Sequence, residues 1–157
     1  MTIYSDAPRL LGVVLSSIYL AGCAAEDFLT RKIRIGSSVC AGAAALFLLL
    51  VKLAGSEDPV KEICFALTAL LPGIMLLILA FAAKGAAGSG DGICYLVLGL
   101  FLGAGTAWLI LAVSLFMASA VGIVLLTLRK AGRKTRMPFL TVSAAAWAVI
   151  LLTGFFR

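Results

Sequence analysis

Long apolar segments recur along almost the whole chain, and they constrain its fold more than any other feature. A helix needs about 20 mostly apolar residues to cross a bilayer. The candidate segments are Leu10 to Ala25, Ser38 to Ala54, Ile63 to Ala83, Ile93 to Leu102 with the glycines after it, Trp108 to Leu128, and Phe139 to Phe156. Only 13% of the residues are charged, against about 25% in soluble domains. The sequence therefore predicts an all-α, polytopic integral membrane protein with about six transmembrane helices.

The fourth and fifth segments form one apolar run from Ile93 to Leu128, which is too long for a single crossing. Gly103-Ala104-Gly105-Thr106 lies inside this run, and glycine-rich stretches of this kind form tight turns. We therefore expect two helices joined by a turn there. No internal repeat or soluble linker interrupts the chain, so residues 1–157 are expected to form a single transmembrane domain.

The distribution of basic residues predicts the orientation of the protein in the membrane. Its formal net charge is +6, which in a soluble protein would suggest nucleic-acid binding. When loops are assigned alternately to the two sides, however, nine of the thirteen Lys and Arg fall on one side. The positive-inside rule makes that side cytoplasmic. The expected topology has both termini outside and cytoplasmic loops near residues 26–37, 84–92 and 129–138, with lipid rather than nucleic acid as the partner.

Leu20-Ala21-Gly22-Cys23 resembles a bacterial lipoprotein cleavage box, which would remove the first segment and attach lipid to Cys23. The region before it contains an Asp and only one Arg. Cleavage would also leave the basic residues 31–34 outside the cell, against the charge asymmetry. We therefore expect the first helix to remain intact.

The ionisable side chains favour chemistry based on carboxylates over a metal site or a disulfide framework. The four cysteines form no C-x-x-C pair, and they are expected to be helix-packing residues. The chain has no His, which disfavours Ser-His, Cys-His and most zinc mechanisms. No metal or cofactor is expected.

Two acidic residues, Asp27 and Asp91, lie beside apolar segments on the predicted cytoplasmic side. A charge at membrane depth costs a few kcal/mol, so each requires a reason. Asp27 could pair with the basic residues that follow it, and Asp91 could cap the next helix. Together they also suggest a dyad, in which one carboxyl stays protonated and the other activates water. Gly88 and Gly90 precede Asp91, and lacking a Cβ they allow unusual backbone angles or close approach of another chain.

Three motifs resemble known families. Gly88-Ser89-Gly90-Asp91 looks like the G-x-G-D motif of intramembrane-type aspartic proteases. The stretch Asp27-Phe28-Leu29-Thr30-Arg31-Lys32-Ile33 resembles the D-x-x-x-R-x-I run of the type IV prepilin peptidase family in its short form, and Arg136-Met137-Pro138-Phe139 is similar to that family's entry to the last helix. The order of the motifs and the helix count agree from residue 10 to the C-terminus.

The resemblance implies that Asp27 and Asp91 are the catalytic pair of a membrane aspartic endopeptidase. Such an enzyme would remove a short basic leader from type IV prepilin-like precursors at the cytoplasmic membrane of a prokaryote, cutting after a Gly that precedes an apolar stretch. The chain lacks the N-terminal cysteine-rich region that larger members are thought to use for methylation, so peptidase activity alone is implied. No cofactor is implied, and the oligomeric state and the particular pilin stay open.

The chain also departs from the family pattern. Arg34-Ile35 stands where the family usually has Pro-Asn, and Ile93 stands where it usually has a Lys. A Lys there would favour an ionised carboxylate, so its absence implies a differently tuned dyad or reduced activity. Two other functions therefore remain open, namely a catalytically inactive relative that binds pilin precursors and a small transporter coupled to protons or cations.

Overall fold

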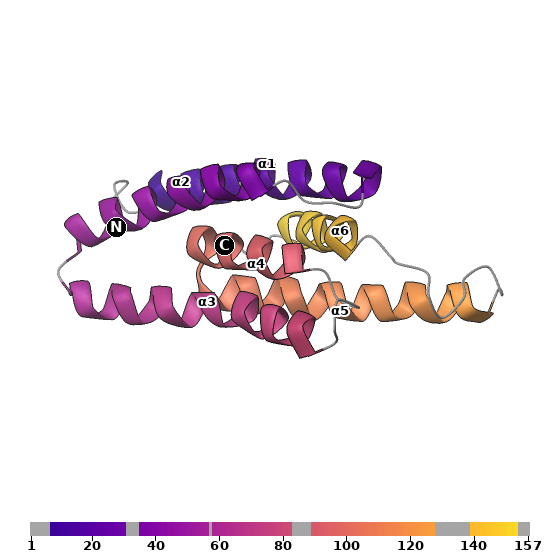
Figure 1. Ribbon diagram of the computed structural model, residues 1–157. Helices are drawn as coiled ribbons and strands as arrows, with labels where there is room; N and C mark the ends of the chain where they lie inside the picture. Colours follow the sequence, from indigo (N-terminus) through magenta and orange to yellow (C-terminus); the bar gives the residue numbers. More distant parts are fainter. Residues whose placement is uncertain (1–6, 31–34, 57, 83–88, 128–138, 154–157) are drawn as a thin grey trace.

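The protein is all-helical in the computed structural model, which describes residues 7–30, 35–56, 58–82, 89–127 and 139–153 (Figure 1). The helices are α1 (Ala7–Thr30), α2 (Ile35–Ala54), α3 (Pro59–Ala82), α4 (Ser89–Leu102), α5 (Ala104–Thr127) and α6 (Phe139–Leu152). These six helices confirm the predicted class and the order of the apolar segments. The turn expected between the fourth and fifth segments is also confirmed, because Gly103 separates α4 from α5 with a positive φ of 81°, an angle that favours glycine.

Four apolar helices are long enough to cross a membrane, and they indicate a membrane protein. Within the described residues these candidate spans are Leu10–Leu29, Gly36–Ala54, Pro59–Ala82 and Ala104–Val124. Helices α4 and α6 have 14 residues each, which at about 1.5 Å per residue gives roughly 21 Å, less than the ~30 Å of the hydrocarbon core. The described helices therefore provide four candidate spans where the sequence predicted about six.

The outward faces of the long helices carry large apolar side chains. Phe81 is 81% exposed, Phe116 is 77% exposed and Ile18 is 65% exposed. Monomeric soluble proteins rarely expose apolar patches of this extent. These faces are suited to contact with lipid tails.

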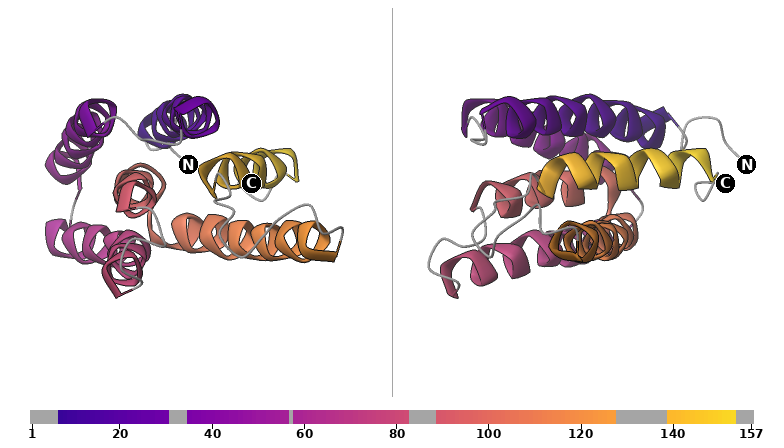
Figure 2. Two further views of the ribbon diagram at one scale, coloured as in Figure 1. Left: turned by 45° about the vertical axis from the view of Figure 1, so that its right-hand side comes forward. Right: turned by 90° about the vertical axis from the view of Figure 1, so that its right-hand side faces the viewer.

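The six helices form three layers, with α1 and α2 on one side, α4 and α6 in the middle, and α3 and α5 on the other (Figures 1 and 2). Helix α4 packs against α1, α2, α3 and α5. Its contact with α3 is especially close, since a Cβ on Gly99 would overlap the carbonyl oxygen of Ala69. The short α4 is thus the centre of the molecule, and seven of its residues are buried.

A polar group in the middle of α4 joins three helices. The Tyr95 hydroxyl is hydrogen-bonded to Ser114 Oγ on α5 at 3.1 Å and to Ser143 Oγ on α6 at 3.0 Å. All three side chains are buried. In a membrane interior, where water is absent, such groups must find partners within the protein, so these bonds fix α5 and α6 relative to α4.

The helices alternate in direction, which decides what lies at each end of the bundle. In Figure 1, α1, α3 and α5 run from left to right, and α2, α4 and α6 run from right to left. The C-terminal end of α1 and the N-terminal ends of α4 and α6 therefore point to the same side. This side carries the residues that the sequence singled out.

Candidate functional site

The two predicted carboxyl groups lie on helices that pack together. Asp27 is in the last turn of α1 and Asp91 is in the first turn of α4, and both are half-buried. Asp91 precedes the apolar stretch that begins at Ile93 and lies outside the four candidate spans. Burial and, as a smaller contribution, the negative charge of Asp27 raise the pKa of Asp91 from its ordinary 3.8 to about 7. The fold therefore brings the two carboxyl groups close enough to influence each other's ionisation.

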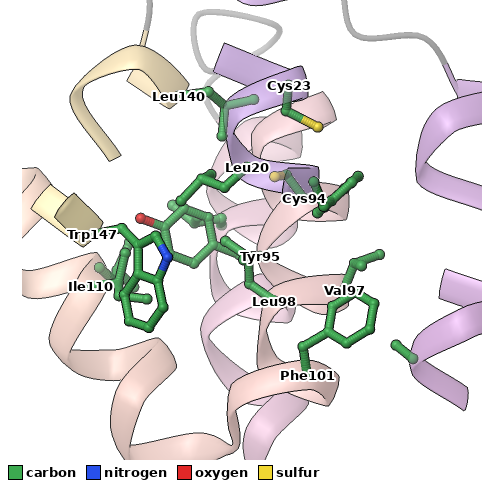
Figure 3. Close-up of a cluster of buried hydrophobic side chains, with 14 of the residues drawn as sticks. Leu20, Cys23, Cys94, Tyr95, Val97, Leu98, Phe101, Ile110, Leu140 and Trp147 are labelled. Atoms are coloured by element: carbon green, nitrogen blue, oxygen red, sulfur yellow. The ribbon is translucent and has the colours of Figure 1, made fainter. Parts of the chain in front are cut away.

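A pair of buried cysteines supports this alignment of α1 and α4. Cys23 precedes Asp27 by four residues and Cys94 follows Asp91 by three, and helical residues at these spacings share a face. Cys23 and Cys94 are both buried and belong to the same cluster of core side chains (Figure 3). The faces of α1 and α4 that carry the aspartates are therefore turned toward each other. The sequence had predicted helix packing for these cysteines, without their place in one cluster.

Helix α6 closes the site beside Asp27. The backbone N–H of Leu140, the second residue of α6, donates a hydrogen bond to Asp27 Oδ2 at 3.2 Å. Two further bonds hold α6 along α1: Thr141 Oγ1 donates to the carbonyl of Ala24 at 3.4 Å, and Trp147 Nε1 donates to Ser17 Oγ at 2.9 Å. The entry to the last helix, which the sequence had singled out by its motif, thus begins next to Asp27.

The sequence also allowed two simpler roles, a helix cap for Asp91 and an ion pair for Asp27. Asp91 is the third residue of α4, so it lies inside the first turn and is not the cap that precedes the helix. A carboxylate in the first turn still interacts favourably with the helix dipole. The basic residues 31–34, proposed as ionic partners of Asp27, lie outside the described residues.

Among the motif glycines, Gly90 is half-buried in the first turn of α4, and Gly88 lies outside the described residues. The structure adds Gly92, which the sequence analysis did not single out. A Cβ at Gly92 would lie 2.6 Å from Leu77 Cγ and 3.0 Å from the Leu77 backbone nitrogen. The alternating glycines at 88, 90 and 92 were the sequence signal that could have marked it. Because Gly92 has no Cβ, α3 can lie close to α4 directly beside Asp91.

The arrangement suits acid–base chemistry on a small molecule such as water. Burial and the charge of Asp27 raise the pKa of Asp91 to about 7, and Asp27 accepts a backbone hydrogen bond, so the two carboxyl groups have different surroundings near neutral pH. Within the described helices, no three His, Cys, Asp or Glu side chains come together as metal ligands.

Comparisons with known proteins give no match to any family model, curated protein or solved structure.

Proposed function

We propose that the chain is a membrane aspartic endopeptidase of the type IV prepilin peptidase kind, which cleaves the short basic leader from prepilin-like precursors. The observation that supports this most directly is the packing of α1 against α4, which brings Asp27 and Asp91 to one end of the bundle. Two carboxyl groups that share one proton are the working state of aspartic peptidases. The G-x-G-D motif and the contact between the start of α6 and Asp27 add further support.

In this mechanism one carboxylate takes a proton from water while the water oxygen bonds to the peptide carbonyl carbon. The protonated partner donates its proton to the carbonyl oxygen, which gives a neutral tetrahedral intermediate. The intermediate collapses when a carboxyl proton is transferred to the amide nitrogen and the C–N bond breaks. The second hydroxyl proton returns to the pair, so one water is consumed and the dyad ends with the single proton it began with.

The proposal places the dyad at the cytoplasmic side of a prokaryotic membrane, with six crossings and both termini outside. In this orientation the Gly103 turn lies toward the outside, and the end of α4 that carries Asp91 lies toward the cytoplasm. Cysteines introduced at positions 32, 86 and 133 should react with membrane-impermeant reagents only from the cytoplasm, and one at position 57 only from outside. Labelling of position 133 in intact cells would contradict this orientation.

Cleavage of a synthetic peptide by the purified protein in detergent tests the activity. The peptide should carry a short basic leader, a Gly and then an apolar stretch, and cleavage is expected after the Gly. Asp27→Asn and Asp91→Asn should each reduce the rate about 100-fold to 10,000-fold, and the double variant should be little worse, because the two residues act as a unit. Asp58→Asn is the matched control, since Asp58 is exposed and paired with Lys61. Substantial cleavage by either single variant, measured per folded molecule, would refute the dyad.

A second candidate is a catalytically inactive relative that binds pilin precursors. The hydrogen bond from Leu140 to Asp27 favours it, because this bond gives Asp27 a structural role that does not require catalysis. The same assay separates the two functions. The inactive relative would be supported if the peptide binds without being cleaved. Under this alternative, Asp27→Asn should reduce the amount of folded protein but leave peptide binding unchanged. Neither binding nor cleavage would favour the ion-coupled transporter.

A further inference from the structure

The two carboxyl groups of the site have unequal surroundings. Asp27 accepts the N–H of Leu140, whereas within the described residues no N–H or O–H group donates a hydrogen bond to Asp91. A hydrogen bond donated to a carboxylate favours its ionised form. The contacts therefore favour the ionised form of Asp27 over the ionised form of Asp91.

The donor is the first turn of a helix, which strengthens this difference. Leu140 is the second residue of α6, so its N–H has no partner within that helix and points out of the helix end. The aligned peptide dipoles of α6 place about half a positive charge at this end. Helix α6 carries no acidic residue of its own, so Asp27 is an acceptor from another helix at this positive end.

Other titratable groups lie in the same region. Within the described residues they are Tyr19, Cys23 and Glu26 on α1 and Cys94 and Tyr95 on α4. The described residues of α5 and α6 contain no ionisable side chain. The hydrogen bond from the α6 amide goes to Asp27, so it favours the ionised form of that carboxyl group.

We propose that the first turn of α6 makes the dyad asymmetric, so that Asp27 is the carboxylate and Asp91 is the protonated acid. The assignment of chemical roles rests on the proposed function: Asp27 takes the proton from water, and Asp91 donates to the peptide carbonyl oxygen. The asymmetry itself does not depend on catalysis. Leu140 is a positioning residue in this scheme, since its backbone acts through Asp27 and does not touch the substrate.

Carbon-13 NMR of the aspartate side chains tests the asymmetry without any substrate. The chain has four aspartates, so protein labelled at the Asp carboxyl carbons gives four signals, which single Asp→Asn variants assign. In the wild type we expect the Asp91 signal to change near pH 7 and the Asp27 signal to change at a lower pH than that. The reverse order, or two signals that move together over the same pH range, would overturn the proposal.

Removing the Leu140 N–H tests its cause. The backbone ester Leu140→leucic acid keeps the side chain and deletes only the N–H, and it should move the Asp27 midpoint upward by about one pH unit. The same ester at Ala145, an exposed residue further along α6, controls for weakening of the helix and should leave the Asp27 midpoint unchanged. Equal shifts for the two esters, or none for Leu140, would refute the role of the α6 amide. If Asp27 titrates first but no peptide is cleaved, the asymmetry stands and only the peptidase proposal fails.

Discussion

Replacing Asp91 with Asn should make the folded protein more stable at pH 8, although the change removes a carboxyl group of the proposed dyad. In the folded chain the pKa of Asp91 is raised from 3.8 to about 7. Between these values the folded chain binds more protons at Asp91 than the unfolded chain, so the free energy of unfolding falls as the pH rises and stays low above pH 7. Asn carries no charge, so the free energy of unfolding of the Asp91→Asn variant does not fall in this way as the pH rises.

The size of the effect follows from the pKa difference. One pKa unit corresponds to about 1.36 kcal/mol, so the rise from 3.8 to about 7 corresponds to ~4 kcal/mol. Asp91 is only half-buried, and solvent screening reduces this to about 2 kcal/mol. For a chain of this length, 1 kcal/mol changes Tm by about 2–4 °C, so Asp91→Asn should raise Tm by roughly 4–8 °C at pH 8.

Thermal unfolding in detergent at two pH values checks this prediction. At pH 5 about a third of the pH interval from 3.8 to 7 has been crossed, so the gain should be about a third of that at pH 8. Asp58→Asn is again the control and should show no gain that grows with pH, because Asp58 is exposed and pairs with Lys61. Equal gains at the two pH values, or no gain at pH 8, would show that Asp91 is not held in its neutral form by the fold.

Three further predictions concern how α4 is packed. Oxidation in the membrane with iodine should join Cys23 and Cys94 in a disulfide, because both lie in one buried cluster on the packed helices α1 and α4. Mass spectrometry of a variant without the two exposed cysteines would detect it, and free thiols after full oxidation would contradict the α1–α4 alignment. Gly99→Val should lower the free energy of unfolding by about 2 kcal/mol or more, measured by thermal unfolding, because a Cβ there would overlap a carbonyl of α3. Gly105→Val is the control, since a Cβ at Gly105 meets nothing within 4 Å, and equal losses in the two variants would refute this packing. Gly90→Val, in the first turn beside Asp91, should impair peptide cleavage while the amount of folded protein stays normal; full activity would make this glycine incidental.

The helices could be predicted from the sequence because apolar segments of this length have few alternatives in lipid. The turn at Gly103 was also predictable, since an apolar run from Ile93 to Leu128 must be broken and its glycines mark the place. The ends were less predictable. Helix α1 continues to Thr30, beyond the apolar segment that ends at Ala25. The apolar pattern did not mark this end, because the last residues of the helix include polar ones.

The candidate site was predictable only in part. Alternating helix directions place Asp27 and Asp91 toward one end of the bundle, but they do not say that α1 and α4 are neighbours. That depends on close packing through Gly12, whose Cβ would lie 2.7 Å from the carbonyl oxygen of Phe101 on α4. The hydrogen bond from Leu140 was equally hidden, because a backbone donor has no signature in the sequence.

The Tyr95 hydroxyl has a consequence for how the protein is made. The chain is synthesised from its N-terminus, so α4 leaves the ribosome before α5 and α6. The partners of Tyr95, Ser114 and Ser143, lie on those two later helices. Until α6 is synthesised, the chain lacks a hydroxyl partner of Tyr95 and the backbone donor to Asp27. A chain stalled after α5 is therefore expected to be less firmly packed, and more readily cut by added protease, than one that includes α6.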